Sequence, residues 1–117
     1  MTAGQTAQQE TNVVTLSGRL TAQPEERTLP SGDVLVTFRV SVRRRDTPMS
    51  RGSKQSADWV DCVAVGARCR RSVASWTVGD EVSVEGALRR RFYRTASGAA
   101  TRLEVEALAV RRLSRAR

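Results

Sequence analysis

The sequence predicts an all-β fold: a five-stranded Greek-key barrel with one short α-helix between strands three and four. Apolar and polar residues alternate along five segments, as they do in strands with one buried face. Helical spacing is confined to residues 67–78, where Val73 and Trp76 are three residues apart. Gly86 interrupts a long alternating segment, which favours a bulge or a barrel corner. Because a small sheet must close or cover its edges, a closed barrel is the simplest arrangement.

The first two strands are predicted at residues 12–20 and 34–45. Between them, Pro24 ends the alternation, and residues 29–33 form a hairpin turn because proline presets φ and glycine accepts φ > 0. The core face of the first strand is Val14, Leu16, Gly18 and Leu20. The core face of the second is Val34, Val36, Phe38, Val40 and Val42. Its outer face is basic: Leu35, Thr37, Arg39, Ser41, Arg43 and Arg45.

A loop is predicted at residues 46–57, which lack periodicity and are rich in Ser, Gly and Pro. Alternation resumes in the third strand, residues 58–66. Its inward residues are Val60, Cys62 and Ala64, and its outward residues are Trp59, Asp61, Val63 and Val65. The helix at 67–78 is expected to end near Gly79, with Trp76 buried in the core.

The last two strands are predicted at residues 80–94 and 101–110, with a turn at 95–100. The inward residues of the fourth strand are Val82, Val84, Gly86 and Leu88. Arg89, Arg91 and Tyr93 share its outward face. Phe92 has the parity of Leu88, so we expect it to cap the core.

The chain is long enough for one domain, predicted at residues 12–113, between a disordered N-terminal tail at 1–11 and a short basic tail at 114–117. The N-terminal tail lacks the basic start and the apolar middle of a secretory signal. No apolar stretch approaches the roughly 18 residues that a membrane span needs. A cytoplasmic, nucleoid-associated location without membrane contact is therefore expected.

The charge of the chain predicts a polyanionic partner. It has 20 Lys and Arg residues against 12 Asp and Glu, a formal net charge of +8. Lys54 is the only lysine, and the arginines bind phosphate bidentately and stack on bases. An excess of this size attracts nucleic acid at long range. An acidic membrane surface is the weaker alternative, because no basic amphipathic helix with an apolar face is visible.

The sequence argues against an enzyme. Histidine is absent, which removes the commonest general base and the commonest metal ligand. Cys62 and Cys69 lack the spacing of a zinc site and are expected to be free thiols. Asp58 and Asp61 lie near each other, yet no nucleophile or base accompanies them. No catalytic residue, metal or cofactor is therefore predicted.

Several short motifs follow one another along the chain. They are Asn12–Leu20, Gln23-Pro24-Glu25, Pro30-Ser31-Gly32, Asp58-Trp59-Val60, Val65-Gly66, Val78–Val82, Val84–Arg91 and Glu104-Val105. In order and spacing they resemble the bacterial single-stranded DNA-binding protein family, from about Asn12 to Leu113. The resemblance implies an OB-fold that binds single-stranded DNA without sequence preference in replication, recombination and repair. It also implies a homo-oligomer, a tetramer or a dimer.

The resemblance and the strand pattern together name the candidate site residues. Trp59 matches a base-stacking tryptophan of the family, and Tyr93 matches a second stacking aromatic near the end of strand four. Arg89 and Arg91 match basic residues along the same path. The candidates for nucleic-acid binding are Trp59, Tyr93, Arg39, Arg43, Arg51, Lys54, Arg89, Arg91 and Arg94. A half-buried structural role is the alternative for Trp59, and a solvated surface charge is the alternative for each basic residue.

The chain also departs from the family pattern. Arg45-Asp46 and Val65 stand where relatives often have two further aromatics, and Val60 stands at the place of an interface histidine. The C-terminal residues 111–117 are basic where relatives often carry an acidic tip, so recruitment of repair proteins through such a tail is not expected. These departures keep an alternative open: an OB-fold adapter of a replication-restart or RNA-binding assembly.

Overall fold

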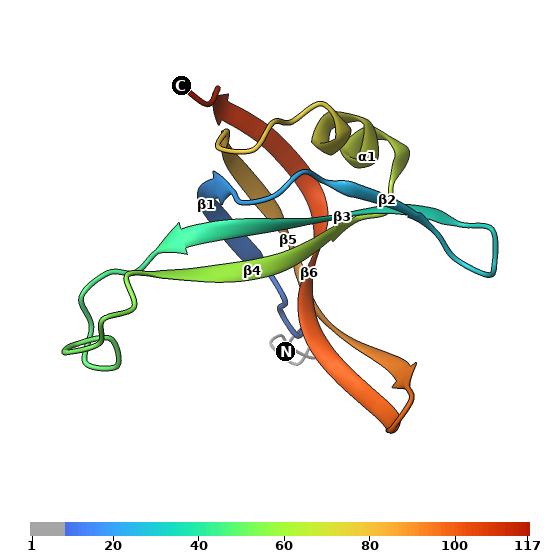
Figure 1. Cartoon of the computed structure of the whole chain (residues 1–117), viewed down its shortest axis with the longest axis horizontal. Coiled ribbons are helices and arrows are strands. Elements are labelled where there is room, and N and C mark those ends of the chain that lie inside the picture. The colour runs from blue at the N-terminus through green and yellow to red at the C-terminus, as the bar shows by residue number, and fades with distance from the viewer. Residues whose placement is uncertain (1–8) are drawn as a thin grey trace, which may run out of the picture.

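In the computed structural model, which describes residues 9–117, two hairpins and one long loop project from a barrel-shaped body (Figure 1). The projections are the β2–β3 hairpin, the β3–β4 loop and the β5–β6 hairpin. The elements are β1 (Val14–Leu20), β2 (Glu25–Thr28), β3 (Val34–Arg43), β4 (Ala57–Ala64), α1 (Ala67–Ala74), β5 (Glu81–Thr95) and β6 (Gly98–Ser114).

Five of these strands close into the predicted barrel. They are hydrogen-bonded in the order β1-β5-β6-β4-β3, and β3 returns to β1 through Arg19 opposite Ser41 and Leu20 opposite Val40. β4 and β6 run parallel, whereas the other strand pairs of the described residues are antiparallel. The predicted fold class, an all-β barrel with a single short helix before its last two strands, is confirmed.

The sequence pattern predicts no strand at β2. This strand pairs with β3, with Glu25 opposite Thr37 at one end. All of its residues are exposed, so no alternation of apolar and polar residues reveals it. The predicted turn does join β2 to β3: the Leu29 N–H donates to the Asp33 carbonyl oxygen at 2.8 Å, and Gly32 has a φ of 93°.

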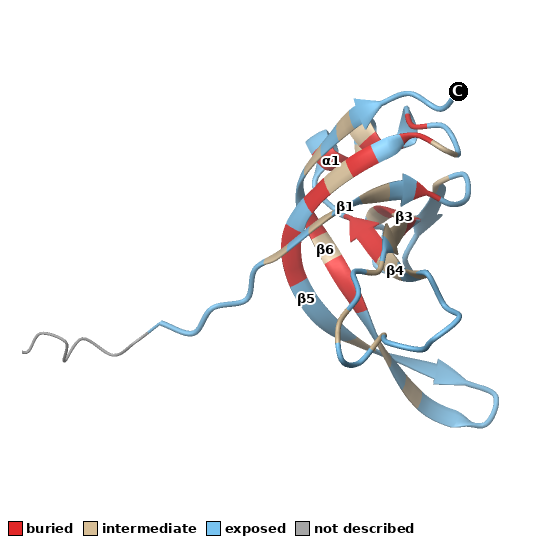
Figure 2. Cartoon of the chain, turned by 90° about the vertical axis from the view of Figure 1, so that its left-hand side faces the viewer, coloured by how far each residue is buried: buried red, intermediate tan, exposed pale blue. Residues whose placement is uncertain are grey.

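The core fills the barrel and the space between the barrel and α1 (Figure 2). Its buried side chains are Leu20, Val36, Phe38, Val40, Cys62, Ala64, Cys69, Val73, Trp76, Val82, Val84, Val105 and Ala107. Phe38 and Trp76 meet edge to face with ring centroids 5.5 Å apart. Leu35 and Val63 lie on the outer face but are buried as well, because longer side chains, Arg27 and Glu106, stand directly opposite them on neighbouring strands.

α1 is shorter than the helix predicted at 67–78. It ends at Ala74, after which the Trp76 N–H donates to the Val73 carbonyl oxygen, three residues back, at 3.0 Å. This tighter turn carries Trp76 off the helix and into the core, where its side chain is buried as predicted. The three-residue spacing therefore reflects burial of both side chains and not a continuous helix. Within residues 9–117, no helix has the length and the apolar character to cross a membrane.

Asp80 ties the end of the chain to the start of β5. Its buried carboxylate accepts the Thr77 N–H and the Ala116 N–H, both at 2.8 Å, and Arg112 Nη1 lies 3.5 Å away. These partners, the Thr77 N–H first, lower the pKa of Asp80 below its ordinary value. The segment predicted as a basic tail at 114–117 is therefore bonded to the barrel through Ala116.

The β5–β6 hairpin is longer than predicted, because β6 begins at Gly98 and continues to Ser114. Its outer part, residues 89–102, extends beyond the barrel and is called the arm below (Figure 1). The strand register shifts between Glu85 and Gly86, which confirms the predicted irregularity at Gly86. A β-carbon at this position would overlap the Glu106 carbonyl group, so only glycine lets the two backbones approach this closely.

Two expectations for β5 are wrong because the strand leaves the barrel. Leu88, expected in the core, is 43% exposed, and Phe92, expected to cap the core, is 72% exposed. Beyond Gly86 the hairpin has little packed against either side, so alternation no longer separates a buried face from a solvated one (Figure 2). Ala87 is buried instead.

The N-terminal tail predicted at residues 1–11 lies mostly outside the described residues, which begin at residue 9. Residues 9–11 are exposed and have no regular structure. From Asn12 the chain is attached to β5: the Asn12 side-chain amide donates to the Leu88 carbonyl oxygen and accepts the Leu88 N–H, both at 2.8 Å.

Asp80→Asn is expected to lower the melting temperature at pH 7, with a smaller difference from wild type in acid. The pKa of Asp80 is depressed in the folded protein. Its stabilisation is therefore complete above the unfolded pKa of about 3.9 and is lost as the pH falls through the folded value. Melting curves followed by circular dichroism at pH 7, 5 and 3 measure the difference.

Asp46→Asn removes an exposed carboxylate and serves as the control for a general charge effect. An Asp80→Asn variant that is destabilised equally at pH 7 and pH 3 would show that the carboxylate charge does not hold this junction.

Candidate nucleic-acid interface

Outward residues from four strands share one surface, called the outer face below. Directly opposite residues of antiparallel strands lie on the same side of a sheet. The opposite pairs are Ser41 with Trp59, Arg39 with Asp61, Arg89 with Glu104, Arg91 with Arg102 and Tyr93 with Ala100. β4 and β6 join the two sets, with Val63 beside Glu106. The predicted outward placement of Trp59, Tyr93, Arg89 and Arg91 therefore agrees with the strand register.

Trp59 is the large aromatic side chain nearest the middle of the outer face. It is 60% exposed, so the half-buried alternative does not hold. Arg39 Cζ lies 4.0 Å from the centroid of its ring, and Arg39 Nε donates to Asp61 Oδ1 at 2.9 Å. An exposed indole next to a guanidinium offers a π surface for a base close to positive charge.

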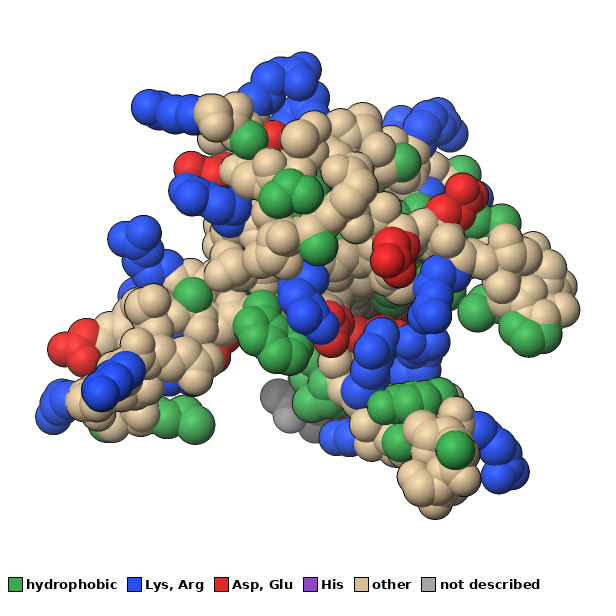
Figure 3. Space-filling model, viewed as in Figure 1, with side chains coloured by type: hydrophobic (Ala, Val, Ile, Leu, Met, Phe, Trp, Pro, Cys, Tyr) green, Lys and Arg blue, Asp and Glu red, His purple; other side chains and the backbone are tan. Residues whose placement is uncertain are grey.

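A groove of about 600 Å³ lies beside Trp59. β2, β3, β4 and β6 contribute to it, and its charged lining includes Arg27, Arg39, Asp61 and Arg102. In Figure 3, basic side chains stand on either side of the hollow between the β2–β3 hairpin and the arm. The groove is wide enough for an extended chain of small groups.

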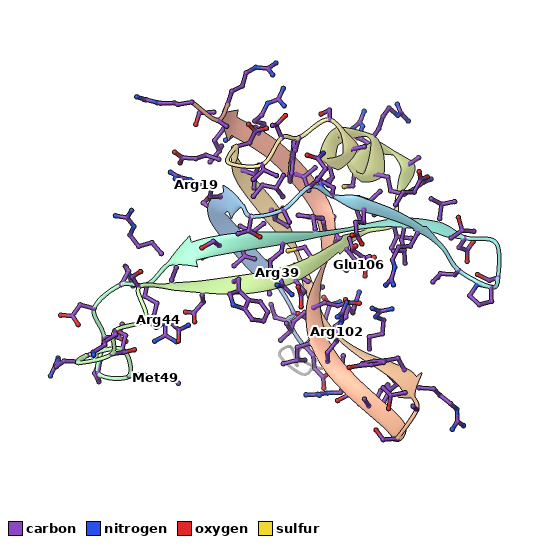
Figure 4. The ribbon with its side chains drawn as sticks, viewed as in Figure 1. Arg19, Arg39, Arg44, Met49, Arg102 and Glu106 are labelled. Atoms are coloured by element: carbon purple, nitrogen blue, oxygen red, sulfur yellow. The ribbon has the colours of Figure 1, made fainter. Side chains whose placement is uncertain are left out.

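Carboxylates neutralise much of the positive charge on the outer face. Glu104 is 5% exposed, with Oε1 at 2.9 Å from Arg91 Nε and Oε2 at 3.6 Å from Arg102 Nη2. Arg89 Nε donates to Glu106 Oε1 at 2.9 Å. Figure 4 shows labelled Arg39, Arg102 and Glu106 along β3 and β6. A phosphate that approaches these arginines therefore competes with a protein carboxylate.

The β3–β4 loop carries two of the candidate basic residues, Arg51 and Lys54, and a third, Arg43, is the last residue of β3 at the start of the loop. All three are exposed, and no carboxylate of the described residues lies within 4.0 Å of their charged groups. At the base of the loop Arg44 holds Asp58 with two hydrogen bonds of 2.9 Å. This contact lowers the pKa of Asp58 and fixes the point where the loop leaves the sheet.

The arm separates the remaining candidates. Tyr93 is 41% exposed and shares the outer face with Arg89 and Arg91. Arg94 lies opposite Ala99 on the other side of the arm, together with Phe92. The structure therefore brings Arg94 to a different side from Trp59. Both sides of the arm present an aromatic ring and arginines to solvent.

The cysteines and two aspartates singled out in the sequence are buried or paired with arginine in the structure. Cys62 and Cys69 are free and buried, and burial raises the pKa of the Cys62 thiol to about 12. Asp58 is paired with Arg44, and Asp61 with Arg39. Within residues 9–117, no group of three His, Cys, Asp or Glu side chains is placed to hold a metal ion.

The sequence pattern misses two basic residues of the groove and the acids that pair with the arginines. Arg27 lies on β2, the strand without a pattern. Arg102, Glu104 and Glu106 do alternate along the last predicted strand, and this alternation is the signal that places them on the outer face. Their pairing with specific arginines depends on the strand register.

Comparisons with known proteins agree with this surface. A family model described as the single-strand binding protein family matches residues 11–113. Single-stranded DNA-binding protein 1 of Staphylococcus aureus is 34% identical over 87 residues, which cover 74% of this chain and 51% of the relative. The single-stranded DNA-binding protein of Mycolicibacterium smegmatis is 38% identical over 92 residues, covering 73% and 53%. The chain spans about half the length of these curated relatives.

The fold is also found among solved structures. The Plasmodium falciparum SSB in complex with single-stranded DNA matches with a TM-score of 0.75 at 20% identity, over 92% of this chain and 98% of the other. At this identity the likeness concerns the fold. The family model covers nearly the whole described chain, and the relatives are over 30% identical to it within the aligned residues. The chain therefore belongs to the single-strand binding protein family.

Proposed function

We propose that the chain binds single-stranded DNA without sequence preference and protects it during replication, recombination and repair. The exposed indole of Trp59, with the Arg39 guanidinium against its ring on the outer face, is the observation that carries this proposal. Stacking on an aromatic ring contributes about 1–3 kcal/mol per base and accepts every base, because each has a π face. The chain acts as a binding protein and not as an enzyme, in the cytoplasm at the nucleoid.

The proposed contacts divide into stacking and phosphate groups. Trp59 and Tyr93 provide the stacking surfaces. The phosphate contacts come from Arg39, Arg43, Arg51, Lys54, Arg89, Arg91 and Arg94. Those on the β3–β4 loop bind first, because no described carboxylate competes for them. Arg89 and Arg91 are already paired with Glu106 and Glu104, so a DNA phosphate competes with these carboxylates. Each of their phosphate contacts therefore contributes less to the binding free energy.

Family membership supports the proposal. The relatives are named as single-stranded DNA-binding proteins, and the matched Plasmodium falciparum structure is a complex with single-stranded DNA. An adapter or RNA-binding role on the same fold remains the alternative that the binding experiment below separates.

We further propose that the chain forms a homo-oligomer, a tetramer or a dimer. β1 pairs with β5 from Val14 to Arg19 but meets β3 only at Arg19 and Leu20. Within residues 9–117, the rest of its second edge has no strand partner, and an open edge is a template for pairing with another copy. The exposed apolar side chains Phe92 on the arm and Leu88 and Leu103 at its base provide a second contact surface.

Light scattering on the purified chain is expected to give a mass four times that of one chain, or twice that mass for the dimer. A single-chain mass at micromolar concentration would refute the oligomer while leaving the binding proposal intact.

Trp59→Ala is expected to weaken binding to oligo(dT) by about 5- to 150-fold, the equivalent of one lost stacking contact. In the wild type, oligo(dT) is expected to quench the fluorescence of exposed Trp59 and to leave that of buried Trp76 unchanged. A fluorescence titration measures the quenching in the wild type, and an anisotropy titration with labelled oligo(dT) measures the affinity of both proteins.

Leu108→Ala removes another exposed apolar side chain and is the control. Equal affinity of wild type and Trp59→Ala would exclude Trp59 as a stacking surface. Binding to RNA or duplex DNA in preference to oligo(dT) would favour the adapter or RNA-binding alternative.

Binding is expected to weaken steeply with salt, with a slope of about −0.7 in log K against log salt for each phosphate neutralised. Replacing Arg43, Arg51 and Lys54 by glutamine removes up to three such contacts and is expected to make the slope shallower by about 2. As the charge-matched control, replacing Arg111, Arg115 and Arg117 by glutamine removes three positive charges near the C-terminus instead. Affinity that does not change with salt would contradict the phosphate contacts altogether.

A further inference from the structure

One face of the Trp59 indole is already covered in the free protein. Arg39 Cζ lies 4.0 Å from the ring centroid, the distance of a close cation–π contact. Arg39 Nε also donates a charge-assisted hydrogen bond of 2.9 Å to Asp61 Oδ1. A base that entered from this side would have to displace the guanidinium and break both contacts.

The strand register shows which side of the ring is covered. Three opposite pairs follow one another on the outer face of β3 and β4: Arg39 with Asp61, Ser41 with Trp59, and Arg43 with Ala57. Arg39 therefore covers Trp59 from the side of Asp61. On the other side of Trp59 along the outer face, the next residue is Ala57, where β4 begins and the β3–β4 loop ends. With one side covered, the indole is still 60% exposed.

The uncovered side has both space and positive charge. Ala57 has only a methyl side chain, and it lines a cavity of about 720 Å³ together with Ser41, Arg43 and Ser56, whereas Trp59 itself lines the groove and not this cavity. Arg43 is exposed, and no carboxylate of the described residues lies within 4.0 Å of it. By contrast, Arg39 in the groove is already paired.

We propose that Arg39 and Asp61 are positioning residues for Trp59, so that a DNA base stacks on the face of the indole toward the β3–β4 loop, with a phosphate against Arg43. The inference rests on the proposed function and specifies the side of Trp59 on which the strand runs. For Arg39 it replaces the phosphate contact proposed above with a contact to the Trp59 ring. Guanidinium, indole and base then form one stack, and the ion pair with Asp61 keeps the indole in place before DNA arrives.

Two alanines on opposite sides of Trp59 provide a matched test. Ala57→Ile fills the loop side, whereas Ala22→Ile adds the same atoms at the edge of the groove on the covered side. Ala57→Ile is expected to weaken binding to oligo(dT) at least about 5-fold and to reduce the quenching of Trp59. Ala22→Ile is expected to stay within about twofold of wild type. The reverse result would place the strand in the groove and overturn the inference.

A second measurement needs no DNA and no substitution on the loop side. Acrylamide quenching of the exposed tryptophan is expected to rise in Arg39→Gln, because the second ring face becomes accessible. Asp61→Asn is also expected to raise the acrylamide quenching. Asp61→Glu is expected to keep the quenching near the wild-type value. Unchanged quenching in Arg39→Gln would show that the guanidinium does not cover the ring, which would also overturn the inference.

The two experiments separate this inference from the proposed function. If wild type does not bind oligo(dT), the proposed function fails, whereas the acrylamide result still tests the covered ring. If wild type binds and Ala57→Ile binds equally well with a normal melting curve, only the loop-side placement fails. If Ala57→Ile lowers the melting temperature, Ala57→Val is tested in its place. This smaller substitution is expected to weaken binding too, but by less.

Discussion

The parallel pairing of β4 with β6 is the constraint on which the rest of the surface depends. β6 is also bonded to β5 along its length, so this one pairing closes the barrel between the two halves of the chain. It sets Val63 beside Glu106 and thereby makes the outer sides of β3, β4 and the arm a single face. Trp59 and Tyr93 share that face for this reason, although they come from strands that do not pair with each other.

Ion pairs decide how positive the outer face is. The chain has a formal net charge of +8, yet the carboxylates of Asp61, Glu104 and Glu106 are each bonded to at least one arginine of this face. Glu104 is buried, and a buried carboxylate is costly unless it has charged or hydrogen-bonding partners. Arg91 and Arg102 therefore stabilise the fold itself, in addition to any contact that they make with a ligand. Among the candidate binding residues, Arg43 at the end of β3 and Arg51 and Lys54 on the β3–β4 loop have no described carboxylate within 4.0 Å.

Alternation predicted the five barrel strands and the outward position of Trp59, because successive side chains of a strand point to opposite faces in any sheet. The alternation pattern failed where the polarity of a side chain did not follow its burial. β2 is exposed throughout, and Phe92 lies on an arm with solvent on both sides, so neither has a pattern that reports its surroundings. The helix was predicted too long because Val73 and Trp76 are both buried, although only Val73 is helical.

The sequence by itself determined the fold class, the face on which each strand residue lies, and the resemblance to the family, because these follow from local periodicity and from the order of short motifs. Tertiary structure alone decided which carboxylate meets which arginine and that Arg39 lies against the ring of Trp59. Those contacts join residues far apart in the chain, such as Arg39 with Asp61 and Arg89 with Glu106. They depend on the register between strands, and a shift of a single residue would exchange one partner for another.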